Sequence, residues 1–500
     1  MKKYVALFTL ILVIAIPFCS WAQTDSFDLS AFAGKRIGIQ TGCKILDQVD
    51  EFIDNPQMYF FSTVPDGITA LREGKIDGFI GDEPVLRYSA SQIEGMQIGI
   101  VEANSNDVAW ACSKDGKMQP LADEMDEFII SQRKSGKLEE MKNRWFDAPD
   151  SQSMEDYSLL PGPRGTLRIA SDTTYPPFEF LKDGMIVGFD IELFGEFCKE
   201  YGYRPQVDTC DFSGIITGVI SGKYDVAVTA LAVTEDRKDS VRFIEPMCRS
   251  SIVLAYMDKA TASQKSSIIE SFRKTFIVED RWKEFASGAL VTLEITVFSI
   301  LIGTILGFAA FLICRRNNKI VNAINSVIRW IIHGMPIVVL LMILYYIVFG
   351  SSDLSGVVIS IIGFSLLFAC FMIDALEGGE RAVDPGQALA ARAMGYGEMQ
   401  AFFKIILPQA AMHIWPSYIE EISSHIKATS VVGFIAVVDI TKIGDIIRGR
   451  TYDAFFPLVA VAIMYFVMAG ILKAIARTIE KKTNPFNRTE AQILGDIKVE

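Results

Sequence analysis

Four long apolar segments in the second half of the chain constrain its fold more than any other feature. They cover residues 289–313, 330–349, 355–374 and 453–472, and each is long enough to cross a lipid bilayer. A fifth apolar segment, 428–440, is short by itself, and we interpret it as a span buried among the others. The second half of the chain is therefore predicted to be an all-α membrane domain of five transmembrane helices.

Basic residues near the segments predict the orientation of this domain. They follow the first and last spans, whereas the loop between the second and third spans has none. Five spans then place the N-terminal half outside and the tail, 481–500, in the cytoplasm. Lys442, Arg448 and Arg450 disagree, because they fall in a predicted outer loop. Glu294, near the outer end of the first span, is either a solvated residue or a functional intramembrane acid.

The first 22 residues have the features of an export signal. Lys2 and Lys3 precede an apolar run, and a small-residue cleavage site ends at Ala22. The alternative is an uncleaved anchor helix, although the run is short for a span. Export exposes the next five cysteines to an oxidising compartment. Because their number is odd, at least one stays unpaired within the chain. Their spacing does not fit a metal site, and we expect no metal and no cofactor.

Residues 30–147 and 166–258 alternate short apolar strands with helix-like stretches, which predicts α/β layers with largely parallel sheets. The predicted strands are 35–39, 78–80, 167–170 and 226–229, and the predicted helices are 66–73, 120–146 and 191–201. Two polar stretches, 148–165 and 259–283, are interpreted as linkers. The net charge of −12 argues against nucleic-acid binding, because phosphates need a basic surface.

The segment between the third and fourth predicted spans favours a short surface helix. Asp384 suits the N-cap, Pro385 suits the first helical position, and Gly395 can end the helix in a left-handed conformation. The helix is rich in alanine and can pack closely against another surface. Taken alone, it is equally compatible with an ordinary loop.

This segment resembles the EAA loop of bacterial ABC importer permeases, in the form found in their polar amino-acid branch. The matching residues run from Gly386 to Gly395, and an Ile-Ile-Leu-Pro motif ending at Pro408 follows within the loop 384–410. Gly334-Met-Pro and Lys427-Ala-Thr-Ser resemble two further family motifs, so that the resemblance covers residues 284–480. Leu389 departs from the glutamate of the family, which puts one polar contact in doubt.

The resemblance implies several partners for the chain. A homodimer of the permease would lie in membrane lipid and bind a separate ABC ATPase subunit, and no phosphate-binding loop occurs in the sequence. The chain is thus expected to be a transporter subunit and not itself an enzyme. The residues implied to dock on the ATPase are Gly386, Gln387, Ala390, Ala391, Gly395 and Pro408.

Three motifs in residues 166–258 contain the groups that a receptor for a free amino acid needs. Such a receptor uses a guanidinium for the α-carboxylate, a carboxylate for the ammonium and apolar walls for the side chain. The motifs are Asp172 to Glu179, Asp211 to Ile216 and Thr234 to Arg237. Each one alone fits ordinary surface chemistry. Together, and in this order, they resemble lobe one of the periplasmic polar amino-acid-binding proteins.

This second resemblance implies a role for each residue of lobe one. Arg237 would bind the α-carboxylate, and Asp172 would line the side-chain end of the site. The remaining contacts would come from the aromatic walls Tyr175 and Phe212, the main chain near Ala230 and the hydroxyl of Thr234. Ala232 replaces a common threonine of the family, so one ligand hydrogen bond is in doubt.

Residues 30–112 resemble lobe two of the same proteins, and residues 113–147 resemble their closing segment. The resemblance implies that Asp82 accepts the ligand ammonium and that Gln40 and Gly42 lie at the rim, while Cys43 replaces the usual threonine. The lobes occur in inverted order along the chain. We interpret this as a circular permutation of one two-lobed domain, with its cleft between Asp82 and Arg237. The alternative is two decayed domains in tandem.

Two other classes of protein fit less well. A ligand-gated channel with the same sensor would have its spans inserted between the lobes, whereas here all spans follow both lobes. An exported enzyme would need a nucleophile and a base, but all three histidines lie in the membrane half. We therefore predict an importer subunit for a polar amino acid in a bacterial inner membrane, with its binding domain in the periplasm. The sequence does not identify the amino acid.

Overall fold

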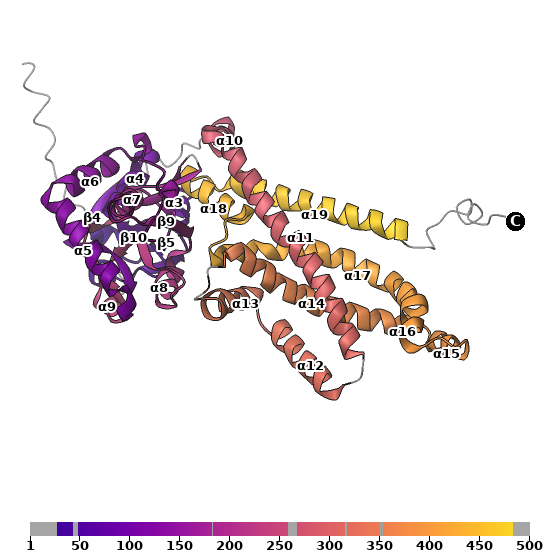
Figure 1. The fold of residues 1–500 in the computed structure, drawn as a ribbon. Coiled ribbons are helices and arrows are strands. Elements are labelled where there is room, and N and C mark those ends of the chain that lie inside the picture. The colour runs from indigo at the N-terminus through magenta and orange to yellow at the C-terminus, as the bar shows by residue number, and fades with distance from the viewer. Residues whose placement is uncertain are drawn as a thin grey trace, which may run out of the picture.

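The computed structural model describes residues 28–43, 49–182, 184–258, 268–315, 318–350, 352 and 354–483 of the 500. The expected signal peptide and the end of the tail lie outside these residues, as does part of the second expected linker. Figure 1 shows an α/β domain at one end of the molecule and a set of long helices extending from it. The two parts correspond to the N-terminal and C-terminal halves of the sequence.

One large sheet of nine strands forms the centre of the α/β domain, and a small sheet, β6-β7-β8, lies beside it. The order of the large sheet is β2-β1-β3-β12-β4-β10-β5-β9, with β11 paired to β4. The strands are β1 Arg36–Gln40, β2 Gln57–Phe61, β3 Gly78–Asp82, β4 Met96–Ser113, β5 Thr166–Ser171, β6 Thr174–Tyr175, β7 Glu179–Lys182, β8 Met185–Val187, β9 Arg204–Thr209, β10 Val226–Ala232, β11 Val241–Phe243 and β12 Cys248–Met257.

The pairing of the strands divides this sheet into two lobes. Strands β2, β1 and β3 are parallel to each other, as are β10, β5 and β9. The long strands β4 and β12 run antiparallel between these two groups. Because β12 comes from the second half of the domain and pairs with β3 from the first, the two sequence halves form one connected, two-lobed structure.

Helices cover both lobes. They are α2 Val49–Phe52, α3 Val64–Arg72, α4 Glu83–Gln92, α5 Gln119–Lys134, α6 Lys137–Asp147, α7 Phe189–Tyr201, α8 Phe212–Ile220 and α9 Glu235–Ser240. The single helix predicted at 120–146 is in fact two, α5 and α6, because Gly136 adopts a positive φ of 81° between them.

Helices α5 and α6 pack on lobe one, although they directly follow lobe two in the sequence. Phe128 of α5 contacts Phe197 of α7, and Trp145 of α6 contacts Phe180 of β7. The expected linker at 148–165 also packs on this lobe, where the buried Tyr157 donates a hydrogen bond of 2.6 Å to Glu196. No disulfide bond joins any two cysteines in the described part of the chain.

The membrane domain consists of long helices with short ones at both ends. They are α10 Ile268–Phe276, α11 Arg281–Cys314, α12 Lys319–Gly334, α13 Ile337–Met342, the π-helix η7 Ile343–Val348, α14 Gly356–Ala382, α15 Pro385–Ala393, α16 Glu398–Ala401, α17 Leu407–Ala428, α18 Ile440–Thr451 and α19 Phe455–Thr483. Within the described residues, three stretches are long and apolar enough to cross a membrane: Val278–Cys314, Gly356–Ala382 and Phe455–Lys481.

Two of the predicted spans differ from the observed helices. The segment 330–349 is broken at Met335-Pro336, where α12 and the helical turn that follows it meet at 111°. The segment 428–440 is no span, because it forms the short 3-10 helix η9, Thr429–Ile435, which ends where Ala436 has a positive φ. The fourth long helix beside α14 and α19 is instead α17 (Figure 1). Its charged residues explain why apolarity alone did not reveal it.

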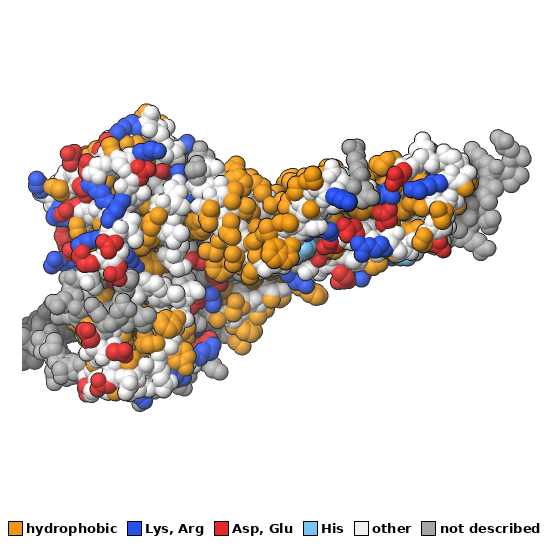
Figure 2. Space-filling model, turned by 90° about the horizontal axis from the view of Figure 1, so that it is seen from below, with side chains coloured by type: hydrophobic (Ala, Val, Ile, Leu, Met, Phe, Trp, Pro, Cys, Tyr) orange, Lys and Arg blue, Asp and Glu red, His pale blue; other side chains and the backbone are white. Residues whose placement is uncertain are grey.

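Helices α11 and α14 approach each other closely at two glycines. A Cβ atom on Gly303 would lie 2.8 Å from the carbonyl oxygen of Ser365, and one on Gly307 would lie 2.6 Å from that of Ala369. The spacing Gly-x-x-x-Gly therefore permits backbone contact between the two helices. Such close packing favours their association in lipid, where the hydrophobic effect does not drive helices together. Figure 2 shows hydrophobic side chains gathered on the part of the helices next to the α/β domain, with charged side chains toward the far end.

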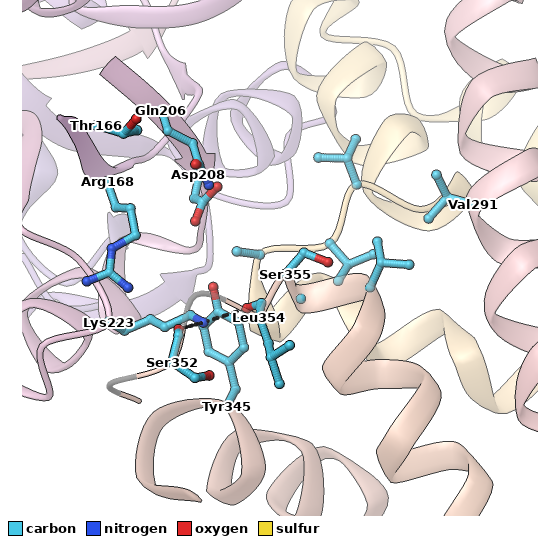
Figure 3. Close-up of a pocket in the computed structure, with 15 residues that line it drawn as sticks. Thr166, Arg168, Gln206, Asp208, Lys223, Val291, Tyr345, Ser352, Leu354 and Ser355 are labelled. Carbon is cyan, nitrogen blue, oxygen red and sulfur yellow. Dashed lines mark hydrogen bonds between the residues drawn. The ribbon is translucent and has the colours of Figure 1, made fainter. Parts of the chain in front are cut away.

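Lobe one rests on the outer ends of the membrane helices. The Nζ atom of Lys223 donates to the carbonyl oxygen of Leu354 at 2.8 Å and lies 4.5 Å from the ring centroid of Tyr345 (Figure 3). The hydroxyl of Tyr345 also hydrogen-bonds to that of Tyr224 at 2.8 Å. These buried polar contacts fix lobe one on the membrane domain.

Candidate substrate site between the lobes

The predicted site residues of lobe two lie at the carboxyl ends of parallel strands. Gln40 is the last residue of β1, and Asp82 is the last residue of β3. Gly42 follows β1 with a φ of 87°, which favours glycine. A Cβ atom there would lie 3.6 Å from the ring of Phe212 in the other lobe. The ends of β1 and β3 therefore face lobe one.

The predicted residues of lobe one follow the strands β5, β9 and β10. Asp172 comes directly after β5 and is only 3% exposed. Phe212 begins α8, for which Asp211 occupies the N-cap position. Arg237 lies in α9, the short helix after β10, and is 7% exposed. Parallel strands end at one edge of their sheet, so these side chains gather on one side of the lobe.

Three hydrogen bonds join predicted site residues across the two lobes. The Nε2 atom of Gln40 donates to Asp172 Oδ2 at 3.2 Å. Arg237 Nη2 donates to the carbonyl oxygen of Gly42 at 3.1 Å. The third bond joins the Tyr175 hydroxyl, as donor, to the carboxylate of Asp82. The structure thus brings together residues that are as far apart in the sequence as Gln40 and Arg237.

The electrostatics of the site favour a ligand that carries both charges. Burial raises the pKa of the Asp82 carboxyl, an effect that the hydrogen bond from Tyr175 and the charge of Arg237 oppose. Burial also raises the pKa of Asp172 and lowers that of Arg237. Desolvation therefore penalises the charged form of all three groups. A ligand ammonium beside a carboxylate and a ligand carboxylate beside Arg237 would remove much of this penalty.

Two residues with expected polar roles have different surroundings. The Oγ1 atom of Thr234 is buried, and no residue described in the structure forms a hydrogen bond with it. A buried hydroxyl of this kind is a place where a ligand can bind. The backbone of Ala230, in contrast, is hydrogen-bonded to the carboxylate of Glu179, which also accepts from the Thr229 hydroxyl. The N–H of Ala230 therefore already donates to a protein carboxylate.

The helix α15 lies at the end of the membrane domain that is far from the α/β domain (Figure 1). Asp384 caps it by accepting from Gly386 N at 2.6 Å, and the positive φ of Gly395 follows its end, as the sequence predicts. Gln387, Ala390 and Pro408 are exposed, whereas Ala391 is buried. Leu389 is 66% exposed, so the predicted docking segment presents an apolar residue to its surroundings.

Sequence reasoning missed the contacts that α18 makes with the α/β domain. Lys442 Nζ pairs with Asp211 Oδ1 at 2.7 Å, and Arg448 pairs with Asp66 at 2.8 Å. Arg450 pairs with Glu279, which precedes α11, at 2.5 Å. These are the three basic residues that disagree with the predicted orientation. That disagreement was the available signal, because basic residues are less frequent in the outer loops of membrane proteins.

The comparisons with known proteins follow the same division of the chain. Residues 299–485 match the family described as binding-protein-dependent transport system inner membrane component. A Bacillus subtilis protein named as an arginine transport system permease is 32% identical over 207 residues, which are 39% of this chain and 90% of that protein. The chain belongs to this permease family.

Other relatives of the permease domain have similar extents. A Rickettsia felis protein named as a glutamine transport system permease is 31% identical over 201 residues, 39% of this chain and 90% of that protein. A nopaline transport system permease of Agrobacterium fabrum is 26% identical over 235 residues, 44% of this chain and 92% of its own. A solved chain of an amino acid ABC transporter is 25% identical, with a TM-score of 0.39, and covers 44% of this chain and 100% of its own.

A second family match covers lobe one of the binding domain. Residues 167–334 match the bacterial extracellular solute-binding proteins, family 3. The match begins at lobe one and continues past the end of β12 into α11 and α12, which the structure assigns to the permease domain. The chain is thus a fused binding and membrane-spanning subunit of an ABC importer. It is a multi-pass protein of the inner membrane with its binding domain outside.

Proposed function

We propose that the chain captures one polar amino acid between its lobes and passes it to its own permease domain. The observation that carries this proposal is the convergence of Asp82, Asp172 and Arg237 across the lobes, with a buried carboxylate and a buried guanidinium in one site. Arg237 would bind the α-carboxylate and Asp82 the ammonium, with Tyr175 and Phe212 on either side of the side chain. The relatives named for glutamine, arginine and nopaline transport support an amino acid or a derivative of one.

We also propose that the binding domain is a single permuted unit. Three features support a single unit over two decayed ones: the antiparallel strands β4 and β12 between the lobes, the pairing of β12 with β3, and the packing of α5 and α6 on lobe one. A single unit contains one site. Two tandem units would contain two.

ATP hydrolysis would be supplied by a separate subunit bound at α15, and the exposed residues Gln387, Leu389 and Ala390 support that location. The permease domain would act as a homodimer in lipid. The exposed apolar residues of α12, such as Ile324, Val327 and Trp330, suit either lipid or a second copy. Cross-linking of the intact chain in membranes, read by mass, separates these two environments of α12.

Calorimetry of the full chain in lipid nanodiscs against the twenty common amino acids tests the proposal. We expect a small subset of polar amino acids to bind, with one ligand per chain. Binding of two ligands per chain would contradict the single permuted unit. The amino-acid assignment is wrong if none of the twenty binds to a preparation whose thermal melt shows that it is folded.

A further inference from the structure

Helix α18 lies between the binding domain and the other membrane helices (Figure 1). It begins after Asp439, whose carboxylate accepts from Lys442 N at 2.9 Å, and it connects η9 to α19. At its far end, the hydroxyl of the buried Tyr452 lies 3.0 Å from that of Ser89 in α4. The permease domain therefore contacts the binding domain through Lys442, Arg448 and Tyr452 of this helix and its end.

The ion pairs of α18 reach both lobes. Lys442 pairs with Asp211, which belongs to lobe one, at 2.7 Å. Arg448 pairs with Asp66, in α3 of lobe two, at 2.8 Å. A rigid helix can keep both pairs only while the lobes hold this mutual orientation. The position of Lys442 is thereby linked to the closure of the lobes.

The ammonium group of Lys442 lies at the anionic end of the substrate site. Lys442 is 7% exposed, and a Cβ atom on Gly433 would lie 3.7 Å from its Cδ atom. Its partner Asp211 directly precedes Phe212, one of the two proposed aromatic walls. The charge of Lys442 also lowers the pKa of Asp172, against the effect of burial. A cation of the permease domain thus pairs with Asp211 and also acts on Asp172.

We propose that the substrate is a basic amino acid. We propose further that Lys442, from the permease domain, competes with the cationic side chain of this substrate for the carboxylates of lobe one. This inference rests on the proposed amino-acid site. A guanidinium or ammonium at the end of a substrate side chain needs the carboxylates of Asp172 and Asp211. When the closed binding domain sits on α18, Lys442 satisfies Asp211, and the site holds a basic side chain less tightly. Docking then favours release.

A cavity next to the site can receive the released substrate. It has a volume of about 860 Å³ and lies between Thr173 and Thr209 of lobe one and the outer end of α11. Glu279, Asp280 and Glu284 line its far side, beside Lys283. The cavity thus lies between lobe one and the permease domain, and Thr173 in its wall directly follows Asp172.

The test uses the full chain in nanodiscs with arginine, lysine and glutamine as ligands. Lys442→Met keeps the apolar stem of the side chain and removes its charge. Arg448→Met is the matched control, because it removes the ion pair that joins α18 to lobe two. We expect Lys442→Met to lower the Kd for arginine and lysine at least tenfold and to leave the Kd for glutamine within twofold. Arg448→Met should leave the ratio of the arginine and glutamine Kd values unchanged.

Weaker arginine binding in Lys442→Met, or an equal change for arginine and glutamine, would overturn the inference while leaving the amino-acid site intact. If wild type binds none of the twenty amino acids, the proposed function itself fails. Lys442→Gln is the second variant if the methionine variant melts at a much lower temperature. It should show the same selective gain in affinity for basic amino acids.

Discussion

Replacement of Arg237 by alanine tests the chemistry of the substrate site. The residue is 7% exposed, and the two hydrogen bonds of its guanidinium, of 3.0 and 3.1 Å, go to the uncharged carbonyl oxygens of Ala232 and Gly42. Among the described residues, no carboxylate forms an ion pair with it. A ligand carboxylate would supply that partner, and a bound carboxylate that loses its buried partner costs about 3–5 kcal/mol.

At about 1.4 kcal/mol for each factor of ten, Arg237→Ala should weaken amino-acid binding by roughly 100-fold to several thousand-fold. The ligand-free protein should melt at nearly the same temperature, because the loss of two hydrogen bonds, about 1 kcal/mol each, is offset by the loss of a buried, unpaired charge. For Arg237→Ala we therefore expect a large loss of ligand affinity and a small change in the melting temperature. A purely structural arginine would give the opposite pattern.

Calorimetry and thermal melting of the full chain measure the two quantities. The matched control is Arg249→Ala, which removes the exposed arginine that pairs with Asp107 at 2.8 Å and should change neither quantity. Arg237→Lys keeps the charge without the bidentate geometry and should fall between wild type and Arg237→Ala. If Arg237→Ala binds the ligand within threefold of wild type, the carboxylate assignment is refuted.

Three further outcomes are expected. Affinity should fall as the pH is lowered through the raised pKa of Asp82, by up to tenfold per unit, because the ammonium binds the ionised carboxylate; a pH series of Kd values should lose this dependence in Asp82→Asn. Gly307→Ala should destabilise the pair of α11 and α14 by about 1–3 kcal/mol, because its Cβ would lie 2.6 Å from a backbone oxygen, and the melting temperature should fall. The control Gly470→Ala, whose Cβ would have nothing within 4 Å, should not lower the melting temperature. Ala390→Asp should reduce copurification of the ATPase subunit and leave amino-acid binding unchanged, since it alters only the exposed face of α15; equal copurification would move the docking surface elsewhere.

The sequence predicts most of the elements that hold the site, because each depends on local signals. The strands at 35–39 and 226–229 and the capped helix after Asp384 are found with small shifts of their ends. Motif resemblance also identifies residues of both lobes, such as Gln40 and Arg237, that the fold then brings together. Their convergence could not be derived from the sequence, because it depends on β4 and β12 crossing between the lobes.

The membrane helices were harder to predict, since apolarity alone was the guide. Pro336 breaks an apolar segment of sufficient length, and α17 is a long helix whose Glu420, Glu421 and Lys427 hide it from a hydropathy scan. The docking contacts of Lys442 and Arg448 depend on a partner domain, and sequence spacing does not show which acid each residue meets. Only their position on the unexpected side of the membrane pointed to them.

ATP-driven uptake of a radiolabelled amino acid tests whether the fused binding domain delivers substrate to its own permease domain. The full chain, copurified with its ATPase subunit, is reconstituted in proteoliposomes with no other binding protein. We expect wild type to accumulate the amino acid and Arg237→Ala not to accumulate it at the same substrate concentration, although both contain equal amounts of the ATPase. Equal uptake by the two proteins would contradict delivery of substrate from the fused binding domain to its own permease domain.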